Sequence, residues 1–341
     1  MRLYTKALDQ HNDGGQIDVV ALIDSPDDNG RMEALGLISA WRYCGCARRR
    51  FRFCWEVLRR SRGADRVVCG HINQLPVIVF ARLFRPRMKC YLVAHGIEVW
   101  RPYTWMQRWA LRKADMIFCV SDYTRRQLQR FLPELGQTRL RLLPNTFDPK
   151  LATRDTAERR PAKVAGPAIL VVSRLSREDN YKGIDCMIEA MPEILALFPG
   201  ATLRIVGGGD DRGRLELLAQ NLGVDSQVHF LGTVDDAILQ SEYSACDLFA
   251  LPSSREGFGL VYLEAMSHEK PCLVARSGGA PEVVDESVGV VVEYGNIYQI
   301  VWAVSDLVRN PRSVKAIQSK LEHYRCVNFT IRLKQLLGEK S

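Results

Sequence analysis

The sequence lacks any stretch that is long and apolar enough to suggest a membrane-spanning helix. Its longest apolar run, Leu75 to Phe84, is interrupted by Arg82 and is much shorter than the ~20 residues that such a helix needs. The first residues, MRLYTKALDQHNDGG, contain no apolar core of the kind found in secretory signal peptides. We therefore expect a cytoplasmic protein.

Closely paired cysteines are also lacking. The ten cysteines include no Cys-x-x-Cys pair, and the closest two are Cys44 and Cys46. Cys90, Cys119 and Cys272 lie in apolar, strand-like runs, which is typical of reduced and buried thiols in a cytosolic protein. Low-complexity segments and repeats are absent as well. We expect neither a bound metal ion nor a cofactor.

The chain does contain enough apolar residues for two cores. Its 341 residues are 47% hydrophobic and 25% charged, which makes two domains the natural expectation. The charge is divided unevenly. Residues 1–150 carry 26 Lys and Arg against 14 Asp and Glu, whereas residues 151–341 carry 21 against 25. The first half is therefore the basic one.

The densest positive segment is Arg42 to Arg66, in which nine arginines are interleaved with Phe51, Phe53 and Trp55. A basic, amphipathic segment with aromatic residues suits an anionic membrane surface or a phosphate-bearing acceptor. A solvated helix face has the same composition, so that alternative stays open. Nucleic acid is disfavoured because no nucleic-acid-binding motif accompanies the charge.

Strand-like runs alternate with helical patterns along the chain, which predicts an α/β protein with parallel sheets flanked by helices. The strands expected in the first half are Ile17 to Ile23, Arg66 to Cys69, Cys90 to Ala94, Met116 to Val120 and Leu140 to Leu143. Those expected in the second half are Ala168 to Ser173, Leu203 to Val206, Val228 to Leu231, Leu248 to Leu251, Cys272 to Ala275 and Gly289 to Val292. The helices include Arg2 to His11, Phe53 to Ser61, Trp105 to Lys113, Gly183 to Phe198, Arg212 to Leu222, Asn296 to Arg309 and Phe329 to Leu337.

Composition shifts place the domain boundaries. We expect a first domain over residues 1–150, a linker rich in polar residues, Pro and Ala over 151–166, and a second domain over 167–325. Residues 326–341 form a separate C-terminal helical segment.

The stretch from Leu251 to Lys270, LPSSREGFGLVYLEAMSHEK, follows a strand and leads into a helix that we expect to be amphipathic. Gly257 and Gly259 allow the backbone to approach a ligand, and the free N–H groups at the start of the helix favour an anion such as a diphosphate. Glu256 and Glu264 flank that position, where both could reach polyols bound beside the phosphates. A solvated glutamate, a glycine turn and a capped helix are the plain structural alternative.

Arg174 ends the first strand of the second half, and Lys182 follows in the segment SRLSREDNYKGID. Ligands of parallel sheets bind at the carboxyl ends of the strands. Two cations there could clamp a diphosphate leaving group without a metal ion.

The Leu251–Lys270 stretch resembles the Glu-x7-Glu signature of family-four-type retaining glycosyltransferases. The resemblance includes the preceding Pro-Ser, the Glu-Gly-Phe-Gly-Leu core and the continuation Leu-Glu-Ala-Met, and it extends over most of the chain. It implies the GT-B fold, in which two Rossmann-like lobes with parallel sheets face each other across a cleft. It also implies that a C-terminal helix returns to the first lobe.

The resemblance implies roles for individual residues on the donor side. Arg174 and Lys182 would contact the donor diphosphate, together with backbone groups of Gly257, Phe258, Gly259 and Leu260. Glu264 would bind the ribose, and Glu256 the hydroxyls of the donor sugar. Gly208, in the Gly207–Gly209 loop, would lie near the nucleotide.

Two residues of the first half resemble the family's acceptor side. His95, in Ala94-His95-Gly96, would orient sugar and acceptor, and Asn145 belongs to a Pro-Asn-Thr turn at the hinge. The donor would be a nucleoside-diphosphate sugar. The basic first half suggests a glycan or lipid-linked acceptor, with the protein peripheral at the inner membrane face and acting in surface polysaccharide assembly.

The family's first strand and its glycine loop have no counterpart here, because the chain opens on the helical pattern of Arg2 to His11. We expect either a start further upstream or a lobe without that strand. This departure keeps open a non-catalytic sugar-nucleotide-binding relative. A sugar-nucleotide epimerase of the same fold is a second alternative, which product analysis without an acceptor would identify.

Overall fold

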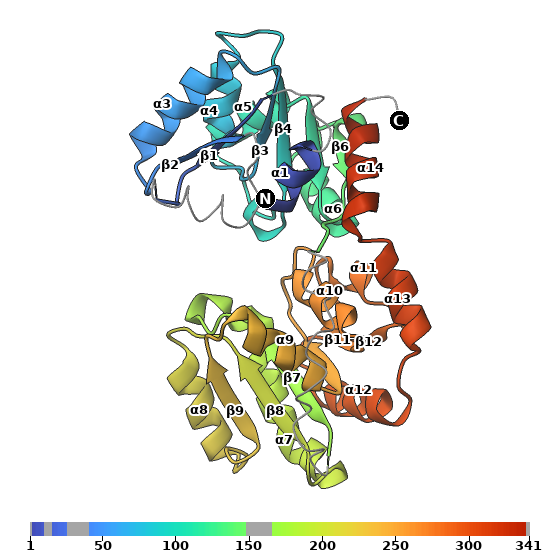
Figure 1. The fold of residues 1–341 in the computed structure, drawn as a ribbon. Coiled ribbons are helices and arrows are strands. Elements are labelled where there is room, and N and C mark those ends of the chain that lie inside the picture. Colours follow the sequence, from blue (N-terminus) through green and yellow to red (C-terminus); the bar gives the residue numbers. More distant parts are fainter. Residues whose placement is uncertain (1, 10–15, 26–40, 148–165, 339–341) are drawn as a thin grey trace. The chain divides into compact units, whose positions relative to one another are not determined.

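A computed structural model describes residues 2–9, 16–25, 41–147 and 166–338. The predicted linker, residues 151–166, lies outside this part except for Gly166. The chain divides into two compact units, the first comprising Met1–Pro144 with Phe329–Ser341 and the second Asn145–Asn328 (Figure 1). The first unit thus takes up most of the C-terminal helix.

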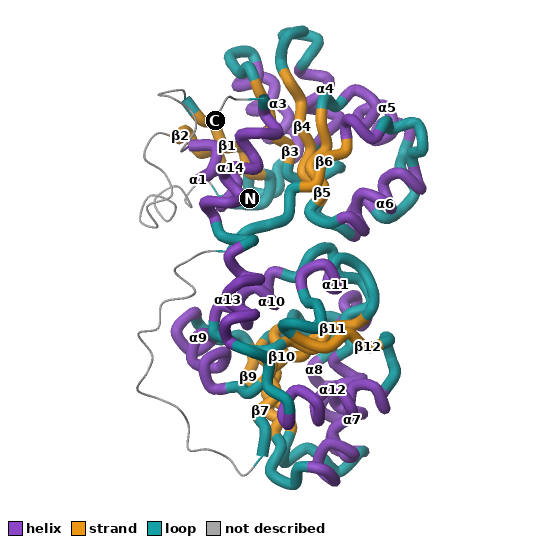
Figure 2. Tube along the Cα trace, turned by 90° about the vertical axis from the view of Figure 1, so that its right-hand side faces the viewer, coloured by secondary structure: helices purple, strands orange, loops and turns teal. Residues whose placement is uncertain are grey.

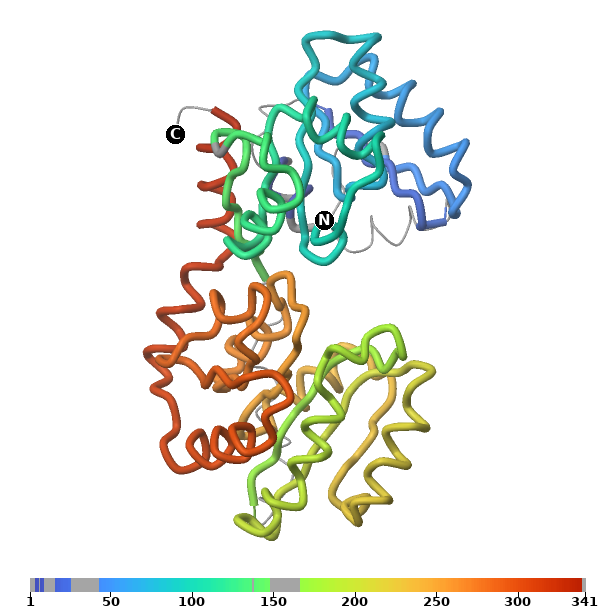
Figure 3. Tube along the Cα trace, turned by 180° about the vertical axis from the view of Figure 1, so that it is seen from behind, coloured from blue at the N-terminus to red at the C-terminus, as the bar shows by residue number. Residues whose placement is uncertain are grey.

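The main sheet of the first unit has four parallel strands in the order β3-β4-β5-β6. Because consecutive parallel strands are joined by right-handed crossovers, the connecting helices α4, α5 and α6 lie on one face, and α3 packs beside α4. Figures 2 and 3 show α3, α4 and α5 side by side on that face. The elements of this unit are α1 (Arg2–Asp9), β1 (Ile17–Ala21), β2 (Trp41–Gly45), α3 (Arg50–Ser61), β3 (Arg66–Cys69), α4 (Leu75–Ala81), β4 (Lys89–Ala94), η1 (Ile97–Val99), α5 (Trp105–Lys113), β5 (Met116–Cys119), α6 (Asp122–Phe131), η2 (Gln137–Arg139), β6 (Leu140–Leu142) and α14 (Cys326–Leu337).

β1 does not join that sheet. It pairs in parallel with β2, with Ile17 opposite Trp41, and the two form a sheet of their own. β2 was not predicted: most of its residues lie in the basic segment Arg42–Arg66, where only the helix Phe53 to Ser61 was expected. The structure divides this segment into a strand, a turn and the helix α3.

α1 and α14 lie on the opposite face of the first unit from α3, α4 and α5 (Figure 2). Tyr4 of α1 and Phe329 of α14 are both buried and meet edge to face, with ring centroids 4.7 Å apart. Tyr4 also lies edge-on to His95, at 6.4 Å. The two ends of the chain are therefore joined by an aromatic contact.

The second unit has one six-stranded parallel sheet in the order β12-β11-β10-β7-β8-β9. Figure 2 shows α7, α8 and α12 on one face and α9, α10 and α13 on the other. The elements are β7 (Ala168–Val172), η4 (Arg177–Lys182), α7 (Ile184–Leu197), β8 (Thr202–Val206), α8 (Arg212–Asn221), β9 (Val228–Gly232), α9 (Asp236–Ala245), β10 (Leu248–Leu251), α10 (Leu260–Ser267), β11 (Cys272–Ala275), α11 (Ala280–Val283), β12 (Gly289–Val292), α12 (Ile297–Arg309) and α13 (Val314–Glu322).

Helix α10 differs from the amphipathic helix expected. Tyr262, Leu263, Ala265 and Met266 are fully buried, so most of its circumference is covered. A helix that is apolar nearly all round belongs to the interior of its domain. α10 is therefore a rigid support for the turn that precedes it.

All ten cysteines are free, and eight are buried, which confirms that most of the thiols are interior. Within the described ranges, no helix combines the length and hydropathy that a membrane span requires.

We predict that Phe329→Ala lowers the free energy of unfolding of the first unit by about 3–5 kcal/mol, because it removes a buried aromatic side chain and leaves a cavity beside Tyr4. Ile331→Ala, at an exposed position on the same helix, should cost about 0.5 kcal/mol or less. Tryptophan fluorescence during denaturant unfolding reports mainly on this unit, since five of the six tryptophans precede Pro144. Equal losses in both variants would contradict the role given to this contact.

Candidate active site

Strand order in the second unit reverses at β7. The chain moves from β7 to β8 and β9 on one side, then continues with β10, β11 and β12 on the other. The loops that follow β7 and β10 therefore leave their neighbouring strands in opposite directions and open a crevice at the carboxyl ends. This is the position that the topology itself marks for a ligand.

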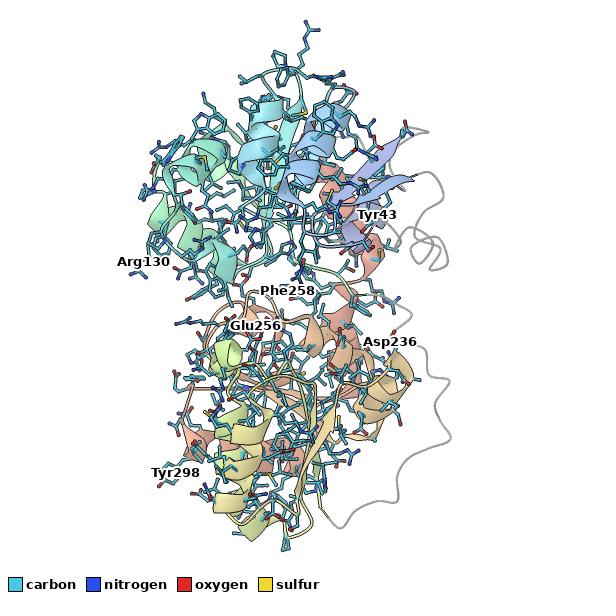
Figure 4. All side chains as sticks on the ribbon, turned by 90° about the vertical axis from the view of Figure 1, so that its left-hand side faces the viewer. Tyr43, Arg130, Asp236, Glu256, Phe258 and Tyr298 are labelled. Carbon is cyan, nitrogen blue, oxygen red and sulfur yellow. The ribbon has the colours of Figure 1, made fainter. Side chains whose placement is uncertain are left out.

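Lys182 and Glu256 meet at this crevice. Lys182 ends η4, in the connection after β7, and Glu256 lies in the turn after β10. Their Nζ and Oε2 atoms are 2.7 Å apart, and both side chains are largely shielded from solvent. Figure 4 shows Glu256 and Phe258 at the same end of the second unit. The structure thus joins two residues that lie 74 positions apart.

Arg174 is held by a second carboxylate. Its Nη2 atom lies 2.9 Å from Oδ2 of Asp179, and the arginine side chain is 80% exposed whereas the aspartate is buried. The Tyr181 hydroxyl donates to the other oxygen of Asp179, at 2.7 Å. The Tyr181 carbonyl accepts the N–H of Ser254, at 2.8 Å. Arg174 is therefore connected to the loop of Glu256 through a chain of hydrogen bonds.

A glycine turn after β11 forms hydrogen bonds with the loop that carries Glu256. The N–H of Gly279 donates to the Glu256 carbonyl at 2.6 Å, and the Ser277 hydroxyl donates to the Ser254 carbonyl at 2.5 Å. Gly278 has φ +65°, and a Cβ atom there would lie 2.2 Å from the Glu256 carbonyl oxygen. Only glycine allows this approach.

The Gly207–Gly209 loop is packed just as closely, but against protein. A Cβ atom at Gly207 would lie 1.8 Å from the Ser173 carbonyl oxygen. The Gly208 carbonyl accepts the N–H of Leu175, at 3.0 Å. The approach that the structure shows is between two loops of the chain, and contact of Gly208 with a nucleotide stays a prediction.

The turn Gly257–Leu260 leads into α10. Gly259 is the residue before the helix, with φ +89°, and no side chain caps the helix there. Phe258 is buried with its ring edge-on to Tyr324, at 5.6 Å, while Leu260 is exposed. An uncapped helix start in the crevice favours a negatively charged ligand.

Glu264 lies inside α10 and faces α9. The hydroxyl of the buried Tyr243 donates to Oε2 of Glu264, at 2.9 Å. The Tyr243 ring stacks on His268, with centroids 5.6 Å apart and planes 12° apart. Burial raises the pKa of the Glu264 carboxyl, and the hydrogen bond from Tyr243 opposes that rise. Tyr243 thus fixes one carboxylate oxygen.

His95 and Asn145 belong to different units. His95 follows β4 in the first unit. Its backbone N–H donates to Oε1 of Glu98, at 2.5 Å. Burial lowers the pKa of the imidazole to about 4, with a smaller contribution from His71, so the ring is neutral at physiological pH. Asn145 is the first residue of the second unit, and the next residue, Thr146, donates to the Tyr324 carbonyl at 2.7 Å.

The structure therefore brings together Lys182 and Glu256 directly and Arg174 indirectly. It places Glu264 on the adjoining helix. Sequence reasoning missed Asp179, Tyr181 and Tyr243, although the acidic residue between Arg174 and Lys182 was a usable signal. No group of three or more potential metal ligands occurs among the residues that the structure describes.

Two family models match the chain in succession. Residues 3–151 match the model described as Glycosyltransferase Family 4, and residues 154–323 match the model described as Glycosyl transferases group 1. The boundary between the matches falls seven to ten residues after the boundary of the two structural units at Pro144.

Curated relatives of the chain have names that agree. It is 34% identical over 253 residues to the GDP-mannose-dependent alpha-(1-6)-phosphatidylinositol monomannoside mannosyltransferase of Mycolicibacterium smegmatis, covering 69% of this chain and 65% of the relative. It is 32% identical over 271 residues to the GDP-mannose-dependent monoacylated alpha-(1-6)-phosphatidylinositol monomannoside mannosyltransferase of Corynebacterium glutamicum, covering 74% of this chain and 69% of the relative. The match spans about two thirds of each relative.

Solved structures give the same fold. The Anabaena protein HepE, in complex with UDP and glucose, superposes with a TM-score of 0.80 at 19% identity, covering 98% of this chain and 95% of its own. The lipopolysaccharide outer core galactosyltransferase WaaB superposes with a TM-score of 0.72 at 14% identity, covering 95% and 99%. With two parallel-sheet units, two matching family models and these neighbours, the chain belongs to the family-four-type group 1 glycosyltransferases and has their GT-B fold.

Proposed function

We propose that the protein is a retaining glycosyltransferase that moves a hexose from a nucleoside-diphosphate sugar to an acceptor hydroxyl. The observation that carries this proposal is the pairing of Lys182 with Glu256 at the crevice between β7 and β10. One residue supplies positive charge for a leaving phosphate and the other supplies hydrogen-bond acceptors for a sugar. Family membership supports the same reaction.

In this reaction the bond between the sugar C1 atom and the diphosphate oxygen breaks, and C1 bonds to the acceptor oxygen. Negative charge develops on the departing diphosphate, where Arg174, Lys182 and the uncapped start of α10 would stabilise it. The chain supplies these charges itself, so we propose a metal-independent reaction. For front-face attack, the acceptor proton would pass to an oxygen of the same phosphate.

The remaining residues would position the substrates. Glu256 would bind hydroxyls of the sugar, and Glu264, with one oxygen fixed by Tyr243, would bind the ribose. The neutral imidazole of His95 would orient sugar and acceptor without adding a competing charge.

The named relatives suggest the substrates to try first. Both are GDP-mannose-dependent and act on a mannosylated phosphatidylinositol. We propose GDP-mannose as the donor and a glycosylated, lipid-linked acceptor, with the protein peripheral at the inner membrane face. The Arg42–Arg66 segment, with exposed Phe51 and Trp55 on α3, supports a location at an anionic surface.

Donor choice is tested by thermal unfolding with GDP, UDP and ADP in turn. A nucleotide at about 100 times its dissociation constant adds ~2.7 kcal/mol to the native state. We expect GDP to raise the midpoint most, and GDP-mannose with a lipid-linked acceptor to give a glycosylated product. Stabilisation by UDP or by ADP, and not by GDP, would contradict GDP-mannose as the donor and indicate a sugar nucleotide of the base that binds. Release of free GDP or an altered nucleotide sugar without acceptor would point instead to hydrolysis or epimerisation.

Removing either cation should nearly stop turnover. We predict that Arg174→Ala and Lys182→Ala each lower kcat by about 10²- to 10³-fold, because each loses a charge that stabilises the transition state. Arg177→Ala removes an exposed arginine of the same η4 segment that forms no ion pair with the residues that the structure describes, and this variant should retain activity. Steady-state rates, with circular dichroism as a check of folding, measure the effect. Full activity in either cation variant would contradict the assignment.

The pH dependence of stability follows from His95. Its pKa is about 4 in the folded protein against an ordinary value of 6.5, so the unfolded chain binds the proton first as the pH falls. The neutral ring contributes up to about 3 kcal/mol to the free energy of unfolding. This contribution is complete above pH 6.5 and is lost as the pH falls from 6.5 to 4. Denaturant unfolding across this range should show a flatter pH profile for His95→Gln. Identical slopes in the two proteins would refute the shift.

A further inference from the structure

The outer surface of the first unit carries an unusual number of exposed aromatic residues. Phe51 of α3 is 95% exposed, Trp105 of α5 is 78% exposed and Trp55 of α3 is 63% exposed. We call the whole set the aromatic face, and it comprises Phe51, Trp55, Phe80, Leu83, Phe84, Trp105, Met106 and Trp109. Solvent-exposed apolar groups at this density mark a surface that meets another phase or molecule.

These residues share one layer of the fold. α4 lies between α3 and α5 on the same face of the sheet (Figures 2 and 3). Phe80 and Phe84 meet edge to face, 6.0 Å apart. The Arg62 guanidinium, just after α3, lies 5.9 Å from the centroid of the Phe84 ring. Arg62 therefore links the end of α3 to the exposed rings that follow α4, and α4 packs against both α3 and α5.

The helices that carry the exposed aromatic residues also bury apolar side chains in the core. α3 buries Phe53 and Val57, α4 buries Leu75, Ile78 and Val79, and α5 buries Ala110 and Leu111. Each helix thus already has an apolar side against the sheet. The exposed aromatic side chains lie outside this buried core.

Positive charge surrounds the aromatic face. α3, α4 and α5 contain seven basic residues and a single acidic one, Glu56. Glu56 is paired with Arg59 and Arg60. In the part of the chain that the structure describes, Arg49, Arg50 and Arg52 form no ion pair with an acidic side chain. The field at this surface is therefore positive.

We propose that the aromatic face docks on the surface of an anionic phospholipid bilayer, with its aromatic rings at the level of the headgroups and its arginines on the lipid phosphates. Tryptophan and tyrosine are the residues that favour this depth, and clustered arginines add attraction to anionic lipid. A second copy of the chain is a poor occupant, because two faces of the same positive charge repel each other. The purpose of this contact rests on the proposed lipid-linked acceptor, but the contact itself requires no turnover. The surface extends beyond Arg42–Arg66 to α4 and α5.

Co-sedimentation of the full chain with vesicles tests the proposal. Vesicles of equal parts phosphatidylcholine and phosphatidylglycerol should bind the protein, and vesicles of phosphatidylcholine alone should bind it far less. The double variants Phe51→Ser with Trp55→Ser, and Trp105→Ser with Trp109→Ser, should each lower the partition coefficient by at least about tenfold. Arg49→Gln with Arg50→Gln should lower it by about tenfold or more and weaken its dependence on salt.

Trp302 gives a matched control. It is 60% exposed on α12 of the second unit, outside the aromatic face, so Trp302→Ser should leave vesicle binding unchanged. Brominated phosphatidylcholine in the anionic vesicles should quench the tryptophan fluorescence of the wild type, and this quenching should be weaker in the variant Trp105→Ser with Trp109→Ser but not in Trp302→Ser. Thermal stabilisation by GDP should persist in every variant, which separates a failure of this proposal from a failure of the proposed function.

Three results would overturn the proposal. Wild-type vesicle binding by both aromatic double variants would show that the face does not dock. Equal binding to neutral and anionic vesicles would remove the role of the arginines. A dimer that dissociates in the aromatic variants, measured by analytical ultracentrifugation without lipid, would assign the face to contacts between copies of the chain.

Discussion

The ion pair between Lys182 and Glu256 is the contact on which the organisation of the second unit depends. It joins the connection after β7 to the connection after β10, at the place where the strand order of the sheet reverses. Its partners are held from several sides, by the hydrogen bond from Ser254 to Tyr181 and by the turn at Gly278. A charged pair in partly shielded surroundings is stable only when its neighbours fix its geometry. Here these neighbours are backbone groups of three adjacent loops.

Aromatic residues near this ion pair connect it with the segments at the boundary of the second unit. Phe258 packs on Tyr324, whose hydroxyl donates to the Glu282 carbonyl at 3.1 Å and whose carbonyl accepts from Thr146. Thr146 and Tyr324 lie in the two segments through which the chain passes from one unit to the other. The turn Gly257–Leu260 is thus linked, through Phe258 and Tyr324, to both of these connecting segments.

The sequence alone predicted the strands of the second unit well, because each is a short apolar run between helical patterns with clear turn residues. β10, β11 and β12 were predicted to the residue. β2 escaped prediction because its strand character comes from pairing with β1, a contact that no local pattern encodes.

The candidate site was predicted through its residue types and only partly through its contacts. Arg174, Lys182 and Glu256 follow from their positions at strand ends. That Arg174 would be held by Asp179, and Glu264 by Tyr243, depends on side-chain directions in the folded chain. Sequence spacing carries no information on those directions. Periodicity likewise shows that α3 and α5 have apolar and polar sides, but not that aromatic residues stand on the solvent side of both.

In the proposed reaction, the two ion pairs would also affect product release, the step after sugar transfer. Glu256 and Asp179 already neutralise the cations that would hold a diphosphate. A nucleoside diphosphate that has lost its sugar keeps only part of its contacts and must compete with carboxylates tethered to the same protein. Such tethered competitors act at a high effective concentration. In the proposed reaction, Glu256 and Asp179 would therefore act as internal counterions that limit inhibition by the nucleoside diphosphate product and by free phosphate.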